Sequence, residues 1–243
     1  MVEEQTMTIS DSHHISQQFE DELQNIKTQF LAMGGQVEQQ LSDALIAFKK
    51  SDLELARSVL DADKKANDFE IEIDEQCVQI IALRQPTASD LRLVTTILKA
   101  ITDLERVGDE ATNIASRAIS SAKKDFSKKQ VQLLKQIGTH VRGLLHEALD
   151  AFARMEPEVA LKVAQEASEI NDEYEGLTRQ LMTYMMEDPR TISVSLDILW
   201  AARSLERVAD HARNLCEYVV YSVKGKDVRH TSFKKMEKVI RKN

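Results

Sequence analysis

One twelve-residue stretch occurs twice in the chain. Residues 103–114 read Asp103-Leu-Glu-Arg-Val-Gly-Asp-Glu-Ala-Thr-Asn-Ile114, and residues 204–215 read Ser204-Leu-Glu-Arg-Val-Ala-Asp-His-Ala-Arg-Asn-Leu215. Seven of the twelve positions are identical. A second match precedes it, because Ala44-Leu-Ile-Ala-Phe48 returns as Ala148-Leu-Asp-Ala-Phe152. Matches near both ends of a unit of about a hundred residues indicate an internal repeat.

Apolar residues follow a helical period along nearly the whole chain. From Ile15 to Phe48 they recur every three or four residues, with polar residues between them, which is typical of amphipathic helices. The chain has 7 Gly and 3 Pro, too few for the turns of an all-β fold. Pro157 and Pro189 stand where new helices would begin. The sequence therefore predicts an all-α fold of two pseudo-symmetric antiparallel three-helix bundles, with six long helices joined by short connections.

The segment boundaries follow from caps and composition. Capping boxes are expected at Ser51–Glu54 and Thr87–Asp90, and a hinge at Ser121–Lys129. Phe48 and Phe152 are predicted to lie buried in equivalent places of the two bundles. The predicted segments are a flexible N-terminus (1–12), a first bundle (13–122), a second bundle (127–223) and a basic C-terminal tail (224–243).

Composition excludes several classes of protein. With 32 Lys and Arg against 40 Asp and Glu, the chain has a net charge of -8, which argues against a nucleic-acid ligand. No run approaches the roughly 20 apolar residues of a membrane span, and the acidic N-terminus does not resemble a signal peptide. Cys77 and Cys216 lie on apolar stripes. We therefore expect a soluble cytoplasmic protein without a membrane span, which leaves peripheral association with membrane complexes open.

The repeated stretch carries pairs of acidic residues. Glu105 and Asp109 stand four residues apart, as do Glu206 and Asp210. On a helix each pair continues the flank of the apolar ridge, and its members repel by about 0.2–0.5 kcal/mol in an isolated helix. The same arrangement at equivalent places in both halves predicts a compensating positive charge.

Two kinds of compensation are open. Arg106, Arg203 and Arg207 each lie three residues before one of these acids and could form salt bridges with them. Alternatively, carboxylates from facing helices could bind a divalent or trivalent metal ion such as Fe, Zn²⁺, Mn²⁺ or Mg²⁺.

Three further residues are weaker candidates for the same metal site. Asn113 and Asn214, one turn further along each helix, could add amide oxygens. His211 could add a nitrogen, although a lone histidine on a surface flank is more often a plain polar residue. No phosphate loop, nucleophile arrangement or organic-cofactor motif is apparent, so the sequence predicts a docking protein and not an enzyme.

These residues also carry a resemblance to a known family. The chain resembles the PhoU proteins, of the proteobacterial type, in five segments that follow the family's order and span nearly the whole chain. The segments are Met33-Gly-Gly-Gln-Val37, Arg84-Gln-Pro-Thr-Ala-Ser-Asp-Leu-Arg92, Leu104-Glu-Arg-Val-Gly-Asp109, Met182-Thr-Tyr-Met-Met-Glu-Asp-Pro-Arg190 and Leu205-Glu-Arg-Val-Ala-Asp210.

The resemblance implies a function. Members of the family repress the phosphate-starvation response, coupling the phosphate ABC transporter to a sensor histidine kinase and its response regulator, and are commonly dimers. Some carry multinuclear metal clusters on the E/D-x-x-x-D helices, which would assign Glu105, Asp109, Glu206 and Asp210 as ligands. Arg142 and Arg213 align close to the second motif, where a positive side chain could replace a cation.

Three hypotheses about function therefore stand side by side. The first is a cytoplasmic adaptor that regulates phosphate uptake. The alternative is a metal-dependent or metal-storing helical bundle that uses the repeated E-x-x-x-D motifs. The third is a coiled-coil scaffold without a switch.

Overall fold

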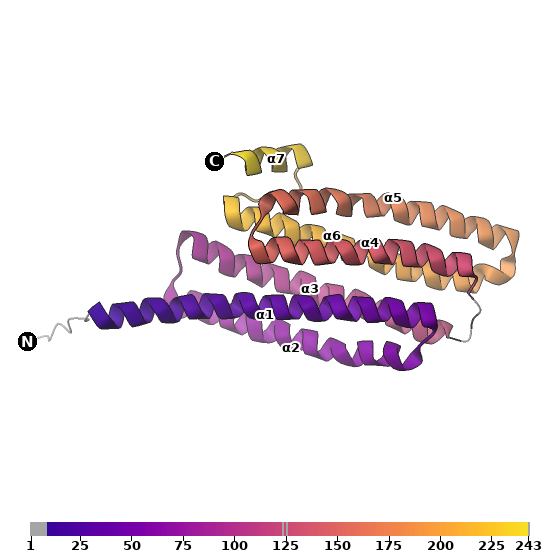
Figure 1. Cartoon of the computed structure of the whole chain (residues 1–243), viewed down its shortest axis with the longest axis horizontal. Coiled ribbons are helices and arrows are strands. Elements are labelled where there is room, and N and C mark those ends of the chain that lie inside the picture. The colour runs from indigo at the N-terminus through magenta and orange to yellow at the C-terminus, as the bar shows by residue number, and fades with distance from the viewer. Residues whose placement is uncertain (1–8, 123, 125, 243) are drawn as a thin grey trace, which may run out of the picture.

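The structure is a computed structural model that describes residues 9–122, 124 and 126–242. Figure 1 shows long helices packed side by side along one common direction. The described residues contain no β-strand, and the predicted all-α fold is confirmed. The elements are α1 (Ile9–Lys50), α2 (Leu53–Arg84), α3 (Ala88–Ser121), α4 (Lys128–Arg154), α5 (Pro157–Glu187), a 3-10 turn η1 (Pro189–Thr191), α6 (Ile192–Lys224) and α7 (Phe233–Arg241).

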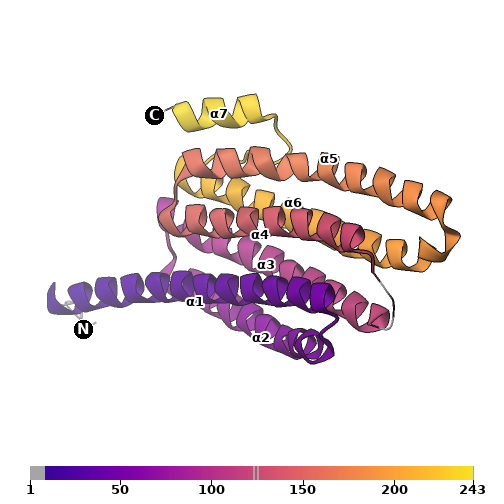
Figure 2. The ribbon, with the colours of Figure 1, turned by 45° about the vertical axis from the view of Figure 1, so that its right-hand side comes forward.

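The helices form the two predicted antiparallel bundles. Helices α1, α2 and α3 pack on one another, as do α4, α5 and α6. The bundles join side by side, because α3 lies against α6 and α1 lies against α4 (Figure 2). Each motif therefore lies on a central helix that contacts both its own bundle and the other one.

The segment predicted to be a basic tail contains a seventh helix. In α7 the residues Phe233, Met236 and Ile240 recur every three or four positions, and Met236 and Ile240 are buried. This apolar face packs on α5 and α6. The sequence analysis predicted the six long helices but not this seventh, short one. The apolar residues of α7 are few and stand among lysines, so their helical spacing is not apparent in the sequence.

The helix ends only partly follow the predicted caps. The side chain of Asp52, and not that of Ser51, caps α2 by accepting a hydrogen bond from the backbone N–H of Leu55 at 3.0 Å. Thr87 precedes α3 without a side-chain cap. A complete capping box forms at Ser127 and Gln130 instead. The helices start where expected, since backbone geometry and tertiary packing set those positions more strongly than side-chain caps do.

Aromatic side chains fasten the two bundles to each other. The Phe152 ring of α4 stacks on Phe30 of α1 with 4.2 Å between centroids, and Phe48 meets Phe126 of the α3–α4 connection at 5.3 Å. Both Phe48 and Phe152 are buried, as predicted. The connection is also tied to α6, because Lys124 Nζ lies 2.6 Å from the carboxylate of Asp197.

Candidate functional site

The two acidic motifs occupy equivalent positions on α3 and α6. Leu104 and Leu205, which precede the acids, are fully buried and fix the rotation of each helix. As a result the first acid of each pair is half-buried and the second is exposed. The prediction that the acids flank the core, and do not lie on the far solvated face, holds for the glutamates Glu105 and Glu206.

Helix α2 adds further carboxylates to the first motif. Asp63 and Glu70 of α2 lie close enough to Glu105 to act on its charge, and Thr102 donates a hydrogen bond to Glu70 at 3.2 Å. Gly108 faces this part of α2, because a Cβ atom there would lie in ordinary contact with Asp63 Oδ1, at 3.5 Å. Four carboxylates from two helices therefore line about two turns of α3. We call Asp63, Glu70, Glu105 and Asp109 the acidic cluster.

Burial and mutual repulsion disfavour ionisation in this cluster. Burial raises the pKa of Glu105, and the neighbouring charges of Asp109, Glu70 and Asp63 raise it further against the opposing effect of Arg106. Burial and then Asp109 also raise the pKa of Asp63. Burial is the largest cause of both raised pKa values, and none of the four carboxylates forms an ion pair among the described residues.

Several polar atoms beside the acidic cluster are buried without a partner. They are Asp63 Oδ1, Asn67 Oδ1 and both polar atoms of the Gln40 amide. Gln40 Oε1 would lie 3.6 Å from a Cβ atom at Gly108, so it faces the same turn of α3. Leaving a buried polar group unsatisfied costs roughly 1–3 kcal/mol. The site is therefore rich in oxygen acceptors that a cation or ordered water would satisfy.

The second motif is neutralised by arginine. Arg203 Nη1 lies 2.6 Å from Glu206 Oε2 and forms an ion pair with it, although the geometry is not that of a hydrogen bond. Arg213 Nη2 lies 3.3 Å from Asp210 Oδ1. Burial raises the pKa of Glu206, and Arg203 opposes that shift most strongly. Arg203 also lies over the ring of Tyr174 at 5.8 Å. A positive side chain thus occupies the place that the salt-bridge alternative assigned to it.

Helix α5 lacks the acids of α2. In the repeat alignment Asp63 corresponds to Ala167 and Glu70 to Tyr174. Ala167 is buried, and Tyr174 packs against the core. At these two aligned positions α5 therefore offers no carboxylate to the second motif.

The other predicted arginines do not meet the predicted acids. Arg207 does not pair with Asp210 but crosses to α3, where its Nε lies 2.7 Å from Glu110. Arg106 forms no ion pair among the described residues. Arg142 donates to Ser42 of α1 at 3.2 Å, in the groove between α1 and α4.

The three weaker metal candidates lie in a network between α3 and α6. His211 Nδ1 is 2.7 Å from Asp103 Oδ1, and Asn214 donates to the same oxygen at 2.9 Å. Asn113 donates to Glu110 at 3.1 Å. His211 is buried, so the expectation of a surface-flank histidine was wrong. Its partner, Asp103, lies 108 residues away in the sequence and could not be found from local spacing.

Asp103 is an important residue that the sequence pattern did not reveal. Its side chain is buried, and it acts on a third residue, because burial and then Asp103 raise the pKa of Tyr218. The only available signal was a difference between the repeats: Asp103 and Glu110 on α3 stand opposite Ser204 and His211 in the alignment. These differing positions face the other bundle.

The acidic cluster fits a metal ion better than the second motif does. Its donors are oxygens, which hard cations such as Mg²⁺ and Mn²⁺ prefer. In the described part of the chain, no three His, Cys, Asp or Glu side chains are grouped as one metal ion requires. Asp63 Oδ1 is nevertheless buried without a partner, and no ion pair compensates the acidic cluster among the described residues. At the second motif, arginines already supply positive charge to Glu206 and Asp210. The assignment of these two acids as metal ligands stays a prediction.

Comparison with known proteins gives the family. A family model described as the PhoU domain matches residues 30–118 and 134–219, one match in each bundle. The chain belongs to the PhoU family. A PhoU homologue from Pseudomonas putida is 50% identical over 236 residues, which cover 97% of this chain and 91% of that relative. PhoU from Escherichia coli strain K12 is 49% identical over 230 residues, 93% of this chain and 94% of that protein.

Solved PhoU structures share the fold. The crystal structure of PhoU from Pseudomonas aeruginosa has a TM-score of 0.83 and 48% identity, and covers 86% of this chain and all of that one. A PhoU structure from Streptococcus pneumoniae, described as a phosphate transport system regulatory protein, has a TM-score of 0.80 and 31% identity, and covers 86% and 99% of the two chains. None of the described helices is long and apolar enough to cross a membrane.

Proposed function

We propose that this chain is a cytoplasmic negative regulator of phosphate uptake and of the phosphate-starvation response. In this proposal it acts as a homodimeric adaptor between the phosphate ABC transporter's ATPase subunit and a sensor histidine kinase with its response regulator. One observation carries the proposal: half of the residues are identical, over 97% of the chain, to a phosphate-specific transport system accessory protein homologue. Relatives of that name support a role in regulating phosphate transport.

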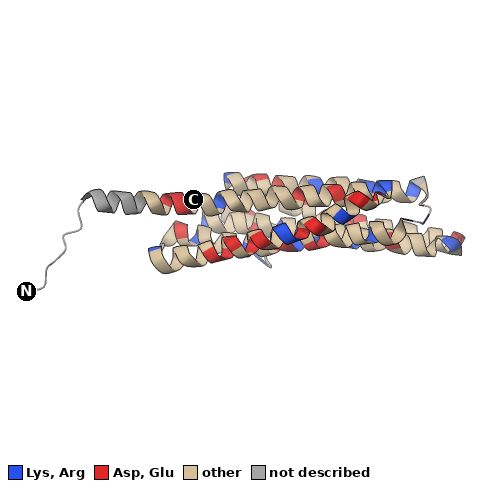
Figure 3. Ribbon diagram, turned by 90° about the horizontal axis from the view of Figure 1, so that it is seen from below, with Lys and Arg blue, Asp and Glu red and all other residues tan. Residues whose placement is uncertain are grey.

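The outer surface supports an adaptor. Large apolar side chains stand exposed on the outer faces of several helices, among them Leu83 at 75%, Met186 at 84% and Trp200 at 55% exposure. Burying apolar side chains such as these on binding would favour association with a partner protein. Acidic and basic residues are interspersed along the helices (Figure 3), and complementary charges on a partner would guide its association.

A deletion strain tests the regulatory role. Deleting the gene should de-repress phosphate-starvation genes at high phosphate, and the full-length chain should restore repression. The purified protein should bind the kinase's cytoplasmic portion or the transporter's ATPase in a salt-sensitive manner, because surface charges are screened beyond about 8 Å at physiological ionic strength. Normal repression in a clean deletion strain would contradict the proposal.

We further propose that the acidic cluster binds a metal ion without turnover. Glu105, Asp109, Asp63 and Glu70 would hold it, and the ion would supply the positive charge that these carboxylates lack. Titration of chelator-treated protein with Mn²⁺, followed by calorimetry, should give heat that is lost in Asp63→Asn. Equal binding by that variant would contradict the assignment, whereas metal-dependent hydrolysis or redox turnover would favour an enzyme.

A further inference from the structure

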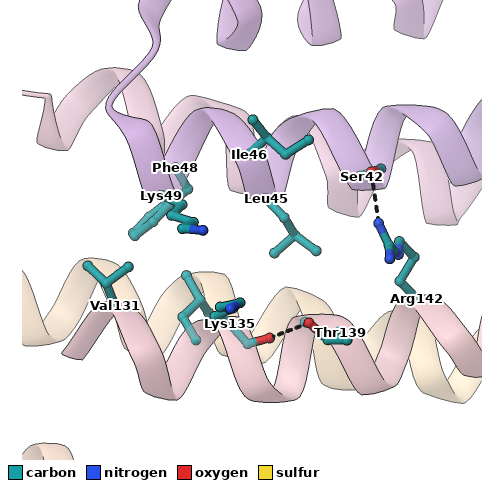
Figure 4. A pocket seen from close by; sticks show the side chains of 11 residues that line it. Ser42, Leu45, Ile46, Phe48, Lys49, Val131, Lys135, Thr139 and Arg142 are labelled. Carbon is teal, nitrogen blue, oxygen red and sulfur yellow. Dashed lines mark hydrogen bonds between the residues drawn. The ribbon is translucent and has the colours of Figure 1, made fainter. Parts of the chain in front are cut away.

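A groove runs along the outside of the molecule between α1 and α4. One end contains a pocket of about 230 Å³ lined by Ser42, Leu45, Ile46, Phe48, Lys49, Val131, Leu134, Lys135, Gly138, Thr139 and Arg142. Figure 4 shows side chains of both helices lining it. A second hollow continues it toward Gly35 and His146, and shares Ser42, Thr139 and Arg142 with the first.

Glycines shape the groove. At Gly138 a Cβ atom would lie 2.9 Å from Leu45 Cδ2, so the missing side chain lets α1 and α4 approach each other. At Gly35 and Gly143 a Cβ atom would meet nothing within 4 Å, so the groove is open there. From Gly35 to Lys49 the groove follows α1 for about 21 Å at 1.5 Å per residue. That length matches about four turns of a bound helix.

The lining combines an apolar floor with a positive rim. Phe48 and Leu134 form the recessed floor, with only 2% and 4% of their surface exposed. Lys49, Lys135 and Arg142 are exposed at the rim. Among the described residues, no acid lines this pocket, in a chain whose net charge is -8.

The rim charges are not paired within the described structure. Arg142 donates to the hydroxyl of Ser42 and not to a carboxylate. Lys49 and Lys135 make no ion pair with a described acid. At the other end of the groove, by contrast, Glu38 pairs with His146 at 3.2 Å. Positive charge is therefore concentrated at the pocket.

We infer that this groove binds an acidic amphipathic helix of about four turns from a partner protein. An amphipathic helix can place apolar side chains between two helix ridges, which is a recurring mode of peptide recognition. Carboxylates on its flanks would meet Lys49, Lys135 and Arg142, and these three cations, which form no ion pair with a described acid, would gain charge-assisted hydrogen bonds. A flat lipid surface would meet the rim charges but would not reach the recessed floor. This inference rests on the proposed adaptor role in one respect: that role is the reason for expecting the partner to be a protein.

A designed peptide tests the inference. The probe is a fluorescein-labelled helical peptide of about 16 residues, with Leu at helical spacing and Glu elsewhere. The matched probe replaces every Glu with Lys. Fluorescence anisotropy with the full chain should show the acidic peptide binding at least about 10-fold more tightly. Equal affinity for both peptides, or binding of neither, would overturn the inference.

Protein variants locate the binding site. The triple variant Lys49→Glu, Lys135→Glu, Arg142→Glu should weaken acidic-peptide binding at least about 10-fold. The control triple variant Lys64→Glu, Lys162→Glu, Lys238→Glu makes almost the same charge change at exposed positions elsewhere and should leave binding within about 2-fold. If the groove triple variant does not fold, Ile46→Glu in the groove replaces it, with Ile71→Glu on α2 as its control. Equal losses in groove and control variants would overturn the inference.

Other occupants give different results. The wild-type protein could instead sediment with phosphatidylglycerol vesicles and fail to bind the peptide, while the groove variant no longer sediments. That result would assign the groove to a membrane surface and overturn the inference. A groove variant that becomes a monomer while the control stays a dimer would assign it to a second copy, and would likewise overturn it. Failure of the peptide assay leaves repression untouched, so the deletion strain still decides the regulatory role separately.

Discussion

The two copies of the acidic motif share a sequence but differ in their surroundings. On α3, Glu105 and Asp109 face two more carboxylates of α2, and the pKa values of Glu105 and Asp63 are raised. On α6, Glu206 and Asp210 face Arg203 and Arg213. The difference teaches that a motif specifies only the placement of its acids. Flanking residues of the same helix and acids of the neighbouring helix decide the rest: α6 carries Arg203 and Arg213 where α3 carries Thr102 and Thr112, and α2 adds carboxylates that α5 lacks at the aligned positions.

The copies also differ where they face each other. Asp103 of α3 accepts hydrogen bonds from His211 and Asn214 of α6, while Ser204 occupies the position on α6 that is equivalent to Asp103. Glu110 of α3 instead receives Arg207. Two identical motifs would have placed acid against acid here. Divergence of the repeats therefore makes the interface between the bundles complementary in charge.

The largest expected effect comes from removing Asp103. Asp103→Ala would leave the buried His211 and Asn214 without their shared acceptor, so we expect a loss of about 2–4 kcal/mol in the free energy of unfolding. Ser204→Ala, at the equivalent position of α6, should cost less than about 1 kcal/mol. Urea unfolding of both variants measures this asymmetry. Similar losses in the two would show that the Asp103 network is not what joins the bundles.

A smaller effect separates the arginines of the two copies. Arg203→Ala would leave the half-buried Glu206 carboxylate without its ion pair, and should cost about 1–2 kcal/mol. Arg106→Ala, beside the first motif, should change stability by less than about 0.5 kcal/mol, because Arg106 is exposed and forms no described ion pair. Thermal unfolding of both in the presence of a chelator makes the comparison. A larger loss for Arg106→Ala would reverse our account of the two sites.

The acidic cluster should make metal-free protein less stable as pH rises. A carboxyl group whose pKa is raised by folding binds its proton more tightly in the folded state than in the unfolded state. Its destabilising effect is therefore absent below the unfolded pKa of about 4, and it grows as pH rises through the folded pKa. Asp63→Asn should therefore stabilise chelated protein at pH 7, and the gain should shrink toward pH 4. Urea unfolding across this range, with the exposed Asp68→Asn as control, measures it. A gain that does not depend on pH would contradict the raised pKa of Asp63.

The smallest effect concerns the glycine that distinguishes the motifs. Gly108→Ala copies Ala209 of the second motif, and its Cβ atom would meet Asp63 and Gln40 only at ordinary contact distances. Helix propensity should then raise stability by about 0.5–1 kcal/mol. Because the added methyl group faces the oxygens of the acidic cluster, Mn²⁺ affinity should fall. Destabilisation by Gly108→Ala would show that the helices cannot accept this methyl group.

Local patterns predicted the fold and the placement of the acids. The spacing of apolar residues predicted the long helices. On a helical wheel of about 100° per residue, Glu105 and Glu206 lie beside leucines of the apolar ridge, and this predicted their position at the edge of the core. The polar residues Asn67 and Glu70, which interrupt the apolar spacing in the middle of α2, were a visible sign that this helix contributes to the site. What periodicity does not give is the rotation of α2 relative to α3, and so the approach of Asp63 to Gly108 remained hidden.

Contacts between distant segments could not be predicted. The pairing of His211 with Asp103 and of Arg207 with Glu110 depends on the bundles packing through α3 and α6. An arginine can reach several acids from one helix position, and sequence spacing alone favoured Asp210 as the partner of Arg207. The helix α7 was missed because its two buried residues, Met236 and Ile240, stand among lysines.

Metal content measures the central difference between the two motifs most directly. The protein would be purified without chelator, and bound metal would be quantified by mass spectrometry for wild type and two double variants. We predict that Glu105→Gln with Asp109→Asn removes the bound metal and leaves folding intact, whereas Glu206→Gln with Asp210→Asn retains it. Equal metal content in wild type and the first variant, or loss in the second variant alone, would contradict the account.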